Sequence, residues 1–236
     1  MVKAVIFDLD ETLYDEMQFV KSGFMAVSLY MANKSNISAD KFYKKLMEIL
    51  SESGRGNVFD IVLKKLELFE KASVCELIKV YRTHKPILSL HSEVNGILAE
   101  LENKSYKLGL ITDGNVEVQR NKVDVLGIKD IFACKVFSDE YGIKKQKPNS
   151  FPYRKALKCL SVMPQQSIYV GDNPYKDFIT ARKLGMHTVR VMRGWYLSVS
   201  LDKEHEADFE IKRLDDILDI LEQVNKSDEK IYYNRR

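Results

Sequence analysis

The feature that most constrains the fold is a regular alternation of short apolar segments with helical patterns. The apolar segments cover residues 2–7, 107–112, 135–138, 167–170 and 187–192, and a shorter one covers 208–211. Most are continuously apolar rather than alternating, which is typical of parallel strands buried on both faces. Between them, apolar residues recur at helical spacing. The alternation predicts an α/β fold with a doubly wound, Rossmann-like parallel sheet.

Helices are expected between these strands wherever apolar residues share one face. Val94, Ile97, Leu98 and Leu101 form one such face, and residues 116–126, 151–160, 177–184 and 215–224 repeat the trend. Glycines at 127 and 185 stand where two of these helices are expected to end.

Residues 16–84 interrupt the alternation, because they show helical patterns only. We expect helices over 19–31, 39–51, 59–66 and 73–81, with a glycine-containing loop at 53–57. Since this segment stands between the first and second strands, it predicts an all-helical domain inserted into the core. The core would comprise residues 1–15 and 85–225, and the polar residues 226–236 would form a C-terminal tail.

Polar side chains follow four of the predicted strands. In chain order they are Asp8 and Asp10, then Thr112 and Asp113, then Lys147 within the basic segment 144–148, then Asp172 and Asp177. Open α/β sheets bind ligands at the carboxyl ends of their strands, so neighbouring strands would bring these side chains together.

A cluster of carboxylates is unfavourable unless a cation or a lysine neutralises it. Oxygen ligands suit Mg²⁺, which often bridges to a substrate phosphate. A carboxylate, a hydroxyl, an ammonium group and a hard metal ion together are the parts needed for phosphoryl transfer. One carboxylate would serve as the nucleophile and a second as the general acid and base.

The motifs resemble those of a known family. Asp8-x-Asp10-x-Thr12, Thr112, Lys147-Pro148 and Gly171-Asp172-x4-Asp177 look like the four motifs of the haloacid dehalogenase superfamily, in order and spacing. The resemblance covers residues 2–221. The helical insertion after the first motif is similar to that of the phosphatase branch with a small helical cap, as in phosphoglycolate phosphatases. The resemblance implies a Mg²⁺-dependent phosphatase that acts on a small phosphate monoester.

The resemblance also implies residue roles. Asp8 would attack phosphorus and form an aspartyl-phosphate. Asp10 would protonate the leaving oxygen and then activate the water that hydrolyses this intermediate. Mg²⁺ would be bound by Asp8, the backbone carbonyl of Asp10 and Asp172.

The phosphoryl oxygens would be held by Thr112 and Lys147, and Asp177 would support Lys147 or a metal-bound water. Many relatives have Asn where this chain has Asp113. The family uses the backbone N–H there, so Asp113 is a candidate phosphate contact whose carboxylate has to point away.

In the predicted cap, Arg55 is a candidate contact for a second anionic group on the substrate, because guanidinium suits such groups. A solvated loop is the alternative, and it is equally compatible with the sequence. Whether Asn57, Arg82 or His84 reach the substrate is left open.

Several other functions compete with hydrolysis of a phosphate monoester. A sugar-phosphate mutase of the same superfamily and a catalytically idle module that binds a phosphorylated ligand both remain alternatives. A dehalogenase is disfavoured, since that chemistry needs neither Asp10 nor Asp172. A dinucleotide-binding domain is disfavoured because no glycine-rich motif follows the first strand.

Charge and cysteine content restrict partners and compartment. The net charge is +3 and the charges of both signs are mixed, which indicates no nucleic-acid partner. The 3 cysteines show no CxxC spacing, and no segment reads as a signal peptide or a membrane span. We therefore expect a cytoplasmic protein, monomeric or homodimeric.

Overall fold

A computed structural model describes residues 1–233, with side chains for residues 1–227. The chain forms two compact units. The core unit comprises Met1–Glu16 and Ser89–Arg236, and the cap unit comprises Met17–Leu88. Within the described residues, every helix is too short or too polar to cross a lipid bilayer.

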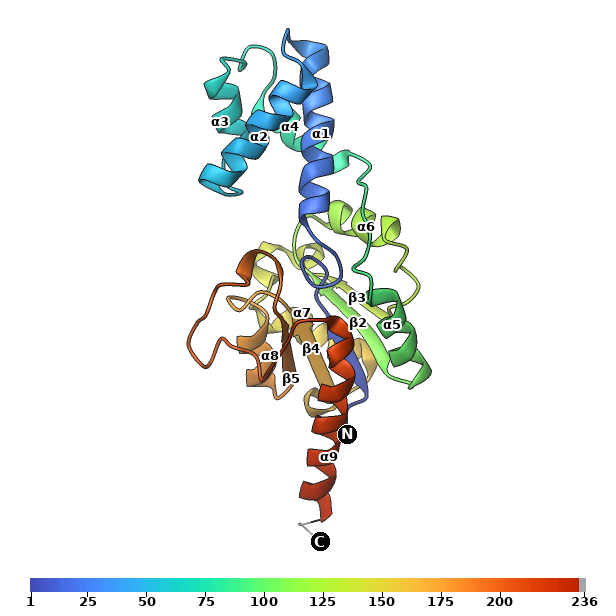
Figure 1. The fold of residues 1–236 in the computed structure, drawn as a ribbon. Helices are drawn as coiled ribbons and strands as arrows, with labels where there is room; N and C mark the ends of the chain where they lie inside the picture. Colours follow the sequence, from blue (N-terminus) through green and yellow to red (C-terminus); the bar gives the residue numbers. More distant parts are fainter. Residues whose placement is uncertain (234–236) are drawn as a thin grey trace. The chain divides into compact units, whose positions relative to one another are not determined.

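The core unit is built on a six-stranded parallel sheet in the order β3-β2-β1-β4-β5-β6 (Figure 1). The strands are β1 (Ala4–Phe7), β2 (Lys107–Thr112), β3 (Cys134–Phe137), β4 (Ser167–Gly171), β5 (His187–Val191) and β6 (Phe209–Ile211). The predicted α/β class and its parallel sheet are confirmed. The four strands that carry the motifs are therefore neighbours in the middle and at one side of the sheet.

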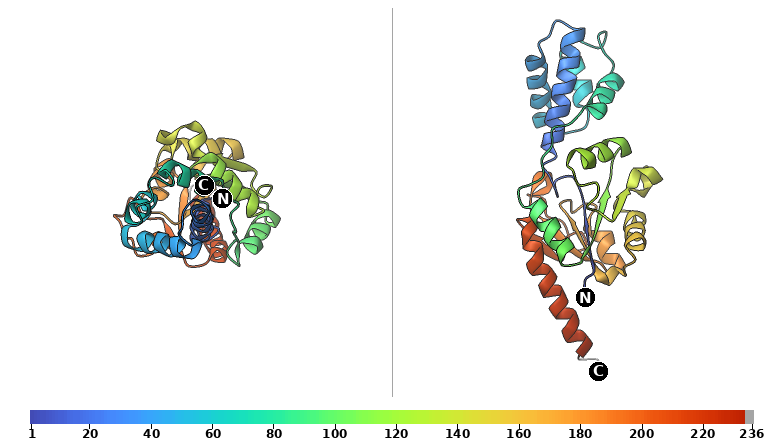
Figure 2. Two further views of the ribbon diagram at one scale, coloured as in Figure 1. Left: turned by 90° about the horizontal axis from the view of Figure 1, so that it is seen from above. Right: turned by 90° about the vertical axis from the view of Figure 1, so that its right-hand side faces the viewer.

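Helices cover both faces of this sheet (Figure 2). Helices α7 (Ser150–Leu160) and α8 (Phe178–Leu184) pack against each other and against the sheet, over a core that includes Ile6, Tyr153 and Tyr169. The other layer contains α5 (Val94–Asn103) and α9 (Ile217–Tyr233). Helix α6 (Val116–Val125) follows β2. Short 3₁₀ turns occur at Ser138–Tyr141, Ile143–Lys145, Pro164–Gln166, Gly194–Tyr196 and Leu214–Asp216.

Helix α9 continues to Tyr233, so residues 226–233 of the predicted polar C-terminal tail are helical. Its first half buries Ile217, Leu221 and Val224 against the core. Once that apolar face has fixed the helix, the polar residues that follow extend it at little cost. The rest of the predicted tail, residues 234–236, lies outside the described residues.

The cap unit contains four helices, α1 (Met17–Lys34), α2 (Ala39–Ser53), α3 (Val58–Lys65) and α4 (Val74–Thr83). They enclose their own apolar core, which includes Phe24, Phe42 and Leu77. Ser38 caps the start of α2, and Ser73 forms a capping box with Glu76 at the start of α4. The two serines therefore mark the starts of the second and fourth helices of this segment.

Candidate active site

The strand register brings the motifs to one edge of the sheet. Phe7, the last residue of β1, pairs with Leu110 of β2 and with Val170 of β4. The next residue, Asp8, leaves the strand with its N–H donating to the carbonyl of Val170 at 2.8 Å. The chain therefore places Asp8 between the carboxyl ends of β2 and β4, where ligands bind in sheets of this kind.

Lys147 lies at the centre of the carboxylate cluster. Its Nζ is 2.7 Å from Oδ1 of Asp8 and 2.8 Å from Oδ1 of Asp177, and it also donates to the Tyr169 hydroxyl at 2.8 Å. The Lys147 side chain is fully buried. Burial lowers the pKa of Lys147, but Asp177 and Asp8 outweigh this effect and hold it well above its usual value. By contrast, Lys144 and Lys145 are exposed, so Lys147 is the lysine of segment 144–148 that reaches the cluster.

Asp172 and Asp177 complete the acidic group. One carboxylate oxygen each from Asp8, Asp172 and Asp177 lie within 4.8 Å of one another. Oδ2 of Asp172 is buried and has no hydrogen-bond partner among the described residues. Burial and the charges of Asp177 and Asp8 raise the pKa of Asp172 well above its usual value. Burial also raises the pKa of Asp8, to about 6, against the lowering effect of Lys147.

Gly171 makes room for Asp177. A Cβ at Gly171 would lie far inside van der Waals contact with Oδ2 of Asp177. In the native arrangement that oxygen accepts a hydrogen bond from the N–H of Asn173 at 3.0 Å. The glycine before Asp172 therefore allows Asp177 to fold back over the end of β4 and reach Lys147.

Asp113 faces away from the acidic cluster, as the phosphate-contact hypothesis requires. Its Oδ1 accepts hydrogen bonds from the Ser138 hydroxyl at 2.6 Å and from the N–H of Lys147 at 3.2 Å, and its Oδ2 lies 3.2 Å from Nζ of Lys176. Burial raises the pKa of Asp113, but Lys147 and Lys176 outweigh it, so the pKa lies below its usual value. The carboxylate is neutralised by these partners and joins the loops after β2, β3 and β4.

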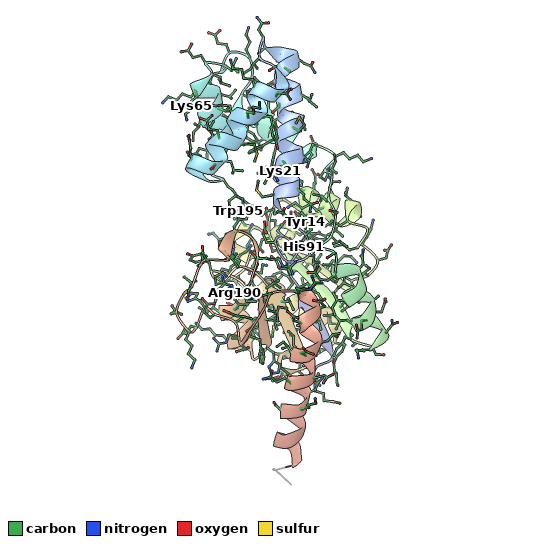
Figure 3. All side chains as sticks on the ribbon, viewed as in Figure 1. Tyr14, Lys21, Lys65, His91, Arg190 and Trp195 are labelled. Atoms are coloured by element: carbon green, nitrogen blue, oxygen red, sulfur yellow. The ribbon has the colours of Figure 1, made fainter. Side chains whose placement is uncertain are left out.

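Asp10 belongs to a second, separate group of polar side chains. Its Oδ1 accepts hydrogen bonds from Nζ of Lys122 at 2.7 Å and from the hydroxyl of Tyr14, and its Oδ2 accepts one from Nε2 of Gln119 at 2.8 Å. Tyr14 is labelled in Figure 3. Burial raises the pKa of Asp10, but the charge of Lys122 and these hydrogen bonds lower it below its usual value.

Gln119 connects Asp10, the predicted acid and base, with Thr112, the predicted phosphate contact. Its Nε2 donates both to Oδ2 of Asp10 and to Oγ1 of Thr112, the predicted phosphate contact at the end of β2. Thr112 is almost completely buried. The predicted acid and base and the predicted phosphate ligand are thus held in one hydrogen-bond network.

Sequence reasoning missed the residues that support the motifs: Tyr14, Gln119, Lys122, Ser138, Tyr169 and Lys176. For two of them a pattern existed. Gln119 and Lys122 share a helix face with the apolar Val123, and buried polar residues on such a face need partners. The partners themselves come from other elements, and no local pattern identifies them.

The predicted cap residues lie in the cap unit. Arg55 is exposed, in the loop between α2 and α3. His84 is buried, with Nε2 at 2.9 Å from the Ser22 hydroxyl and Nδ1 at 2.6 Å from the Tyr81 carbonyl. Both ring nitrogens of His84 therefore have partners within the cap unit.

Comparison with known proteins agrees with this geometry. Residues 5–191, most of the chain, match the family of haloacid dehalogenase-like hydrolases. The chain belongs to this family. It is 32% identical over 238 residues to the glyceraldehyde 3-phosphate phosphatase of Pyrococcus furiosus, covering 98% of both chains. It is 33% identical over 239 residues to the protein of that name from Pyrococcus abyssi, covering 98% of this chain and 99% of the relative.

Among solved structures, the chain is similar to a HAD phosphatase from Thermococcus onnurineus. The TM-score is 0.63 and the identity 26%, over 93% of this chain and 98% of the other. The family predicted from the four motifs is therefore confirmed. The prediction of a phosphatase is confirmed at the level of enzyme class, since the relatives that match over the whole length are phosphatases.

Proposed function

We propose that this phosphatase hydrolyses a small phosphate monoester with Mg²⁺ and through an aspartyl-phosphate on Asp8. The observation that carries the proposal is the buried group formed by Asp8, Lys147, Asp172 and Asp177 at the carboxyl edge of the sheet. A site that only binds phosphate needs positive charge. This one instead places the carboxylate of Asp8 beside one lysine and two further acids, which suits a nucleophile.

The residues present fit a divalent cation. Asp113 pairs with Lys176 outside the cluster, which leaves three carboxylates, those of Asp8, Asp172 and Asp177, around one ammonium group, that of Lys147. The difference is two negative charges, which one Mg²⁺ would neutralise. The buried, unpartnered Oδ2 of Asp172 is an oxygen ligand of the kind that Mg²⁺ prefers.

In this proposal Asp8, Asp172 and the backbone carbonyl of Asp10 would hold Mg²⁺, which would offset charge on the phosphoryl group. Asp8 attacks phosphorus while the bond to the leaving oxygen breaks and Asp10 protonates that oxygen. A water then attacks the aspartyl-phosphate, gives its proton to Asp10, and releases phosphate and free Asp8.

Thr112 and Lys147 hold the phosphoryl oxygens in this scheme. Lys147 already contacts Asp8, so it neutralises the nucleophile before substrate binds and the phosphoryl group afterwards. Asp177 keeps Lys147 in place through the 2.8 Å ion pair. Arg55 of the cap unit stays a candidate for a second anionic group on the substrate.

The first substrate to test is glyceraldehyde 3-phosphate. Five relatives with 30–33% identity carry the name of a phosphatase for this compound. A panel of sugar phosphates, phosphoglycolate and nucleoside monophosphates should be compared with it, because small differences in a pocket change selectivity by only about 10–200-fold.

The decisive experiment measures phosphate release from p-nitrophenyl phosphate and from this panel, with Mg²⁺ or with EDTA, for wild type and Asp8→Asn. We expect release that requires both Mg²⁺ and Asp8. Equal rates for wild type and Asp8→Asn would refute the mechanism. Isomerised sugar phosphate in place of free phosphate would favour the mutase, and absence of turnover together with tight phosphate binding would favour a binding module.

A further inference from the structure

Three side chains that bind Asp10 have no role in the proposed mechanism so far. Asp10 has two carboxylate oxygens, and together they accept three hydrogen bonds: from Tyr14 and Lys122 at Oδ1, and from Gln119 at Oδ2. All three partners donate, and the Lys122 side chain is only 4% exposed. Burying an ammonium group costs free energy because it loses its hydration, and the ion pair with Asp10 offsets part of this cost. We therefore asked what the Lys122 side chain does for Asp10.

Helix α6 supplies two of these donors from one turn. Gln119 and Lys122 are three residues apart and therefore point to the same side of the helix. Nζ of Lys122 also lies 5.9 Å from the centre of the Tyr14 ring, within the range of a cation–π interaction. Lys122 is thus fixed by both a carboxylate and an aromatic face, and in turn it fixes the carboxylate.

We propose that Lys122, with Tyr14 and Gln119, is a positioning residue for the proton transfer that Asp10 carries out; this inference rests on the proposed function. Nζ of Lys122 lies 2.7 Å from Oδ1 of Asp10. It therefore sets the orientation of Asp10. For the first half of the reaction Asp10 has to take up one proton, in place of one of the three donated hydrogen bonds, and it hands this proton to the leaving oxygen as the bond from phosphorus to that oxygen breaks. In the second half of the reaction the same carboxylate takes a proton from the attacking water.

How much the reaction depends on this proton transfer is set by the basicity of the leaving group. An alkoxide is strongly basic and needs the proton as the bond breaks, whereas p-nitrophenolate leaves without one. General acid catalysis contributes about 10²–10⁴-fold where it is needed. Loss of positioning should therefore slow the hydrolysis of alkyl phosphates and leave that of p-nitrophenyl phosphate nearly unchanged. A general defect of folding or of phosphate binding would slow both.

The test compares kcat/KM for p-nitrophenyl phosphate with kcat/KM for the alkyl phosphate of the panel that wild type hydrolyses fastest. This quantity covers the steps up to departure of the leaving group. We expect Lys122→Met to lower it about 10–100-fold for the alkyl phosphate, which is part of the full contribution, and less than about threefold for the aryl phosphate. Lys122→Arg should restore part of the loss, because the charge and donors return.

Tyr14→Phe removes a single donor to Asp10 and keeps the aromatic ring, so it provides a second, milder variant. It should shift the same ratio in the same direction. Lys129→Met is the control, because Lys129 is an exposed lysine paired with exposed Asp124. Thermal unfolding of each variant would check that it folds.

Equal losses on both substrates in Lys122→Met and Tyr14→Phe would overturn the inference. The proposed function would still stand in that case, provided that wild type turns over with Mg²⁺ and Asp8→Asn does not. Unchanged rates in both variants would also overturn it. Activity of Asp8→Asn equal to wild type would instead reject the proposed function.

Discussion

Replacing Asp172 by Asn should stabilise the metal-free protein while removing its response to Mg²⁺. In the structure Oδ2 of Asp172 is buried without a hydrogen-bond partner among the described residues, beside the carboxylates of Asp8 and Asp177. An unsatisfied buried polar group costs about 1–3 kcal/mol, and more if it is charged. Asp172→Asn keeps a polar group at this position but removes its charge, so at a pH above the raised pKa of Asp172 its free energy of unfolding in EDTA should rise by about 1–3 kcal/mol.

For a domain of this size about 1 kcal/mol corresponds to about 2–4 °C in the unfolding midpoint, so we expect a rise of about 5 °C. Wild type should gain about 2.7 kcal/mol when Mg²⁺ reaches about 100 times its dissociation constant. Asp172→Asn should gain little, because it loses a ligand. The stability advantage of the variant in EDTA should therefore shrink by about 2.7 kcal/mol in Mg²⁺, and it reverses if the advantage was smaller than this.

Differential scanning calorimetry in EDTA and in Mg²⁺ would measure both effects. Asp124→Asn is the control, because Asp124 is exposed, and its ion pair with Lys129 contributes about 0–1 kcal/mol. A variant less stable than wild type in EDTA, or one with the full response to Mg²⁺, would refute the reasoning that Asp172 is an unneutralised metal ligand.

Two further predictions concern stability. The folded-state pKa values of Asp8, about 6, and of Asp172 lie above the ordinary 3.8. Since the folded metal-free protein therefore holds protons more tightly than the unfolded chain, its stability should fall as pH rises from about 4 through 6. Urea unfolding in EDTA across this range would test this, and a rise instead of a fall would contradict it. Gly171→Ala should lower stability by about 1–3 kcal/mol through overpacking against Asp177, and lower activity with it. Gly96→Ala on the exposed side of α5, where a Cβ meets nothing within 4 Å, should be neutral or stabilising; similar losses in both variants would contradict the packing argument.

Much of the core unit could be predicted from the sequence because its strands and motifs are recognised from residues close together in the chain. Continuous apolar segments specify buried parallel strands, and motif residues that directly follow those strands must lie at their carboxyl ends. Asp8, Thr112 and Asp172 are placed by this rule alone. Asp177 needs in addition the close approach that Gly171 permits.

The remaining parts of the site depend on long-range contacts. The direction of the Asp113 carboxylate follows from Ser138 and Lys176, which are 25 and 63 residues away in the chain. Lys122 is 112 residues from Asp10. Helical periodicity shows which residues share a face but not which strand end that face meets. The extension of α9 beyond residue 225 was not predicted either, because the residues that follow the apolar face of Ile217, Leu221 and Val224 are polar.

The position of β1 in the sheet has a consequence for how the enzyme loses activity. β1 has a neighbour on each side, and all its residues are buried. Backbone amides in such a strand exchange with solvent only when the whole unit opens, unlike those of a surface loop. The nucleophile is attached directly to this strand. Inactivation by heat or denaturant should therefore coincide with cooperative unfolding of the core unit, and hydrogen exchange of Phe7 and Val5 should report the same free energy as loss of activity.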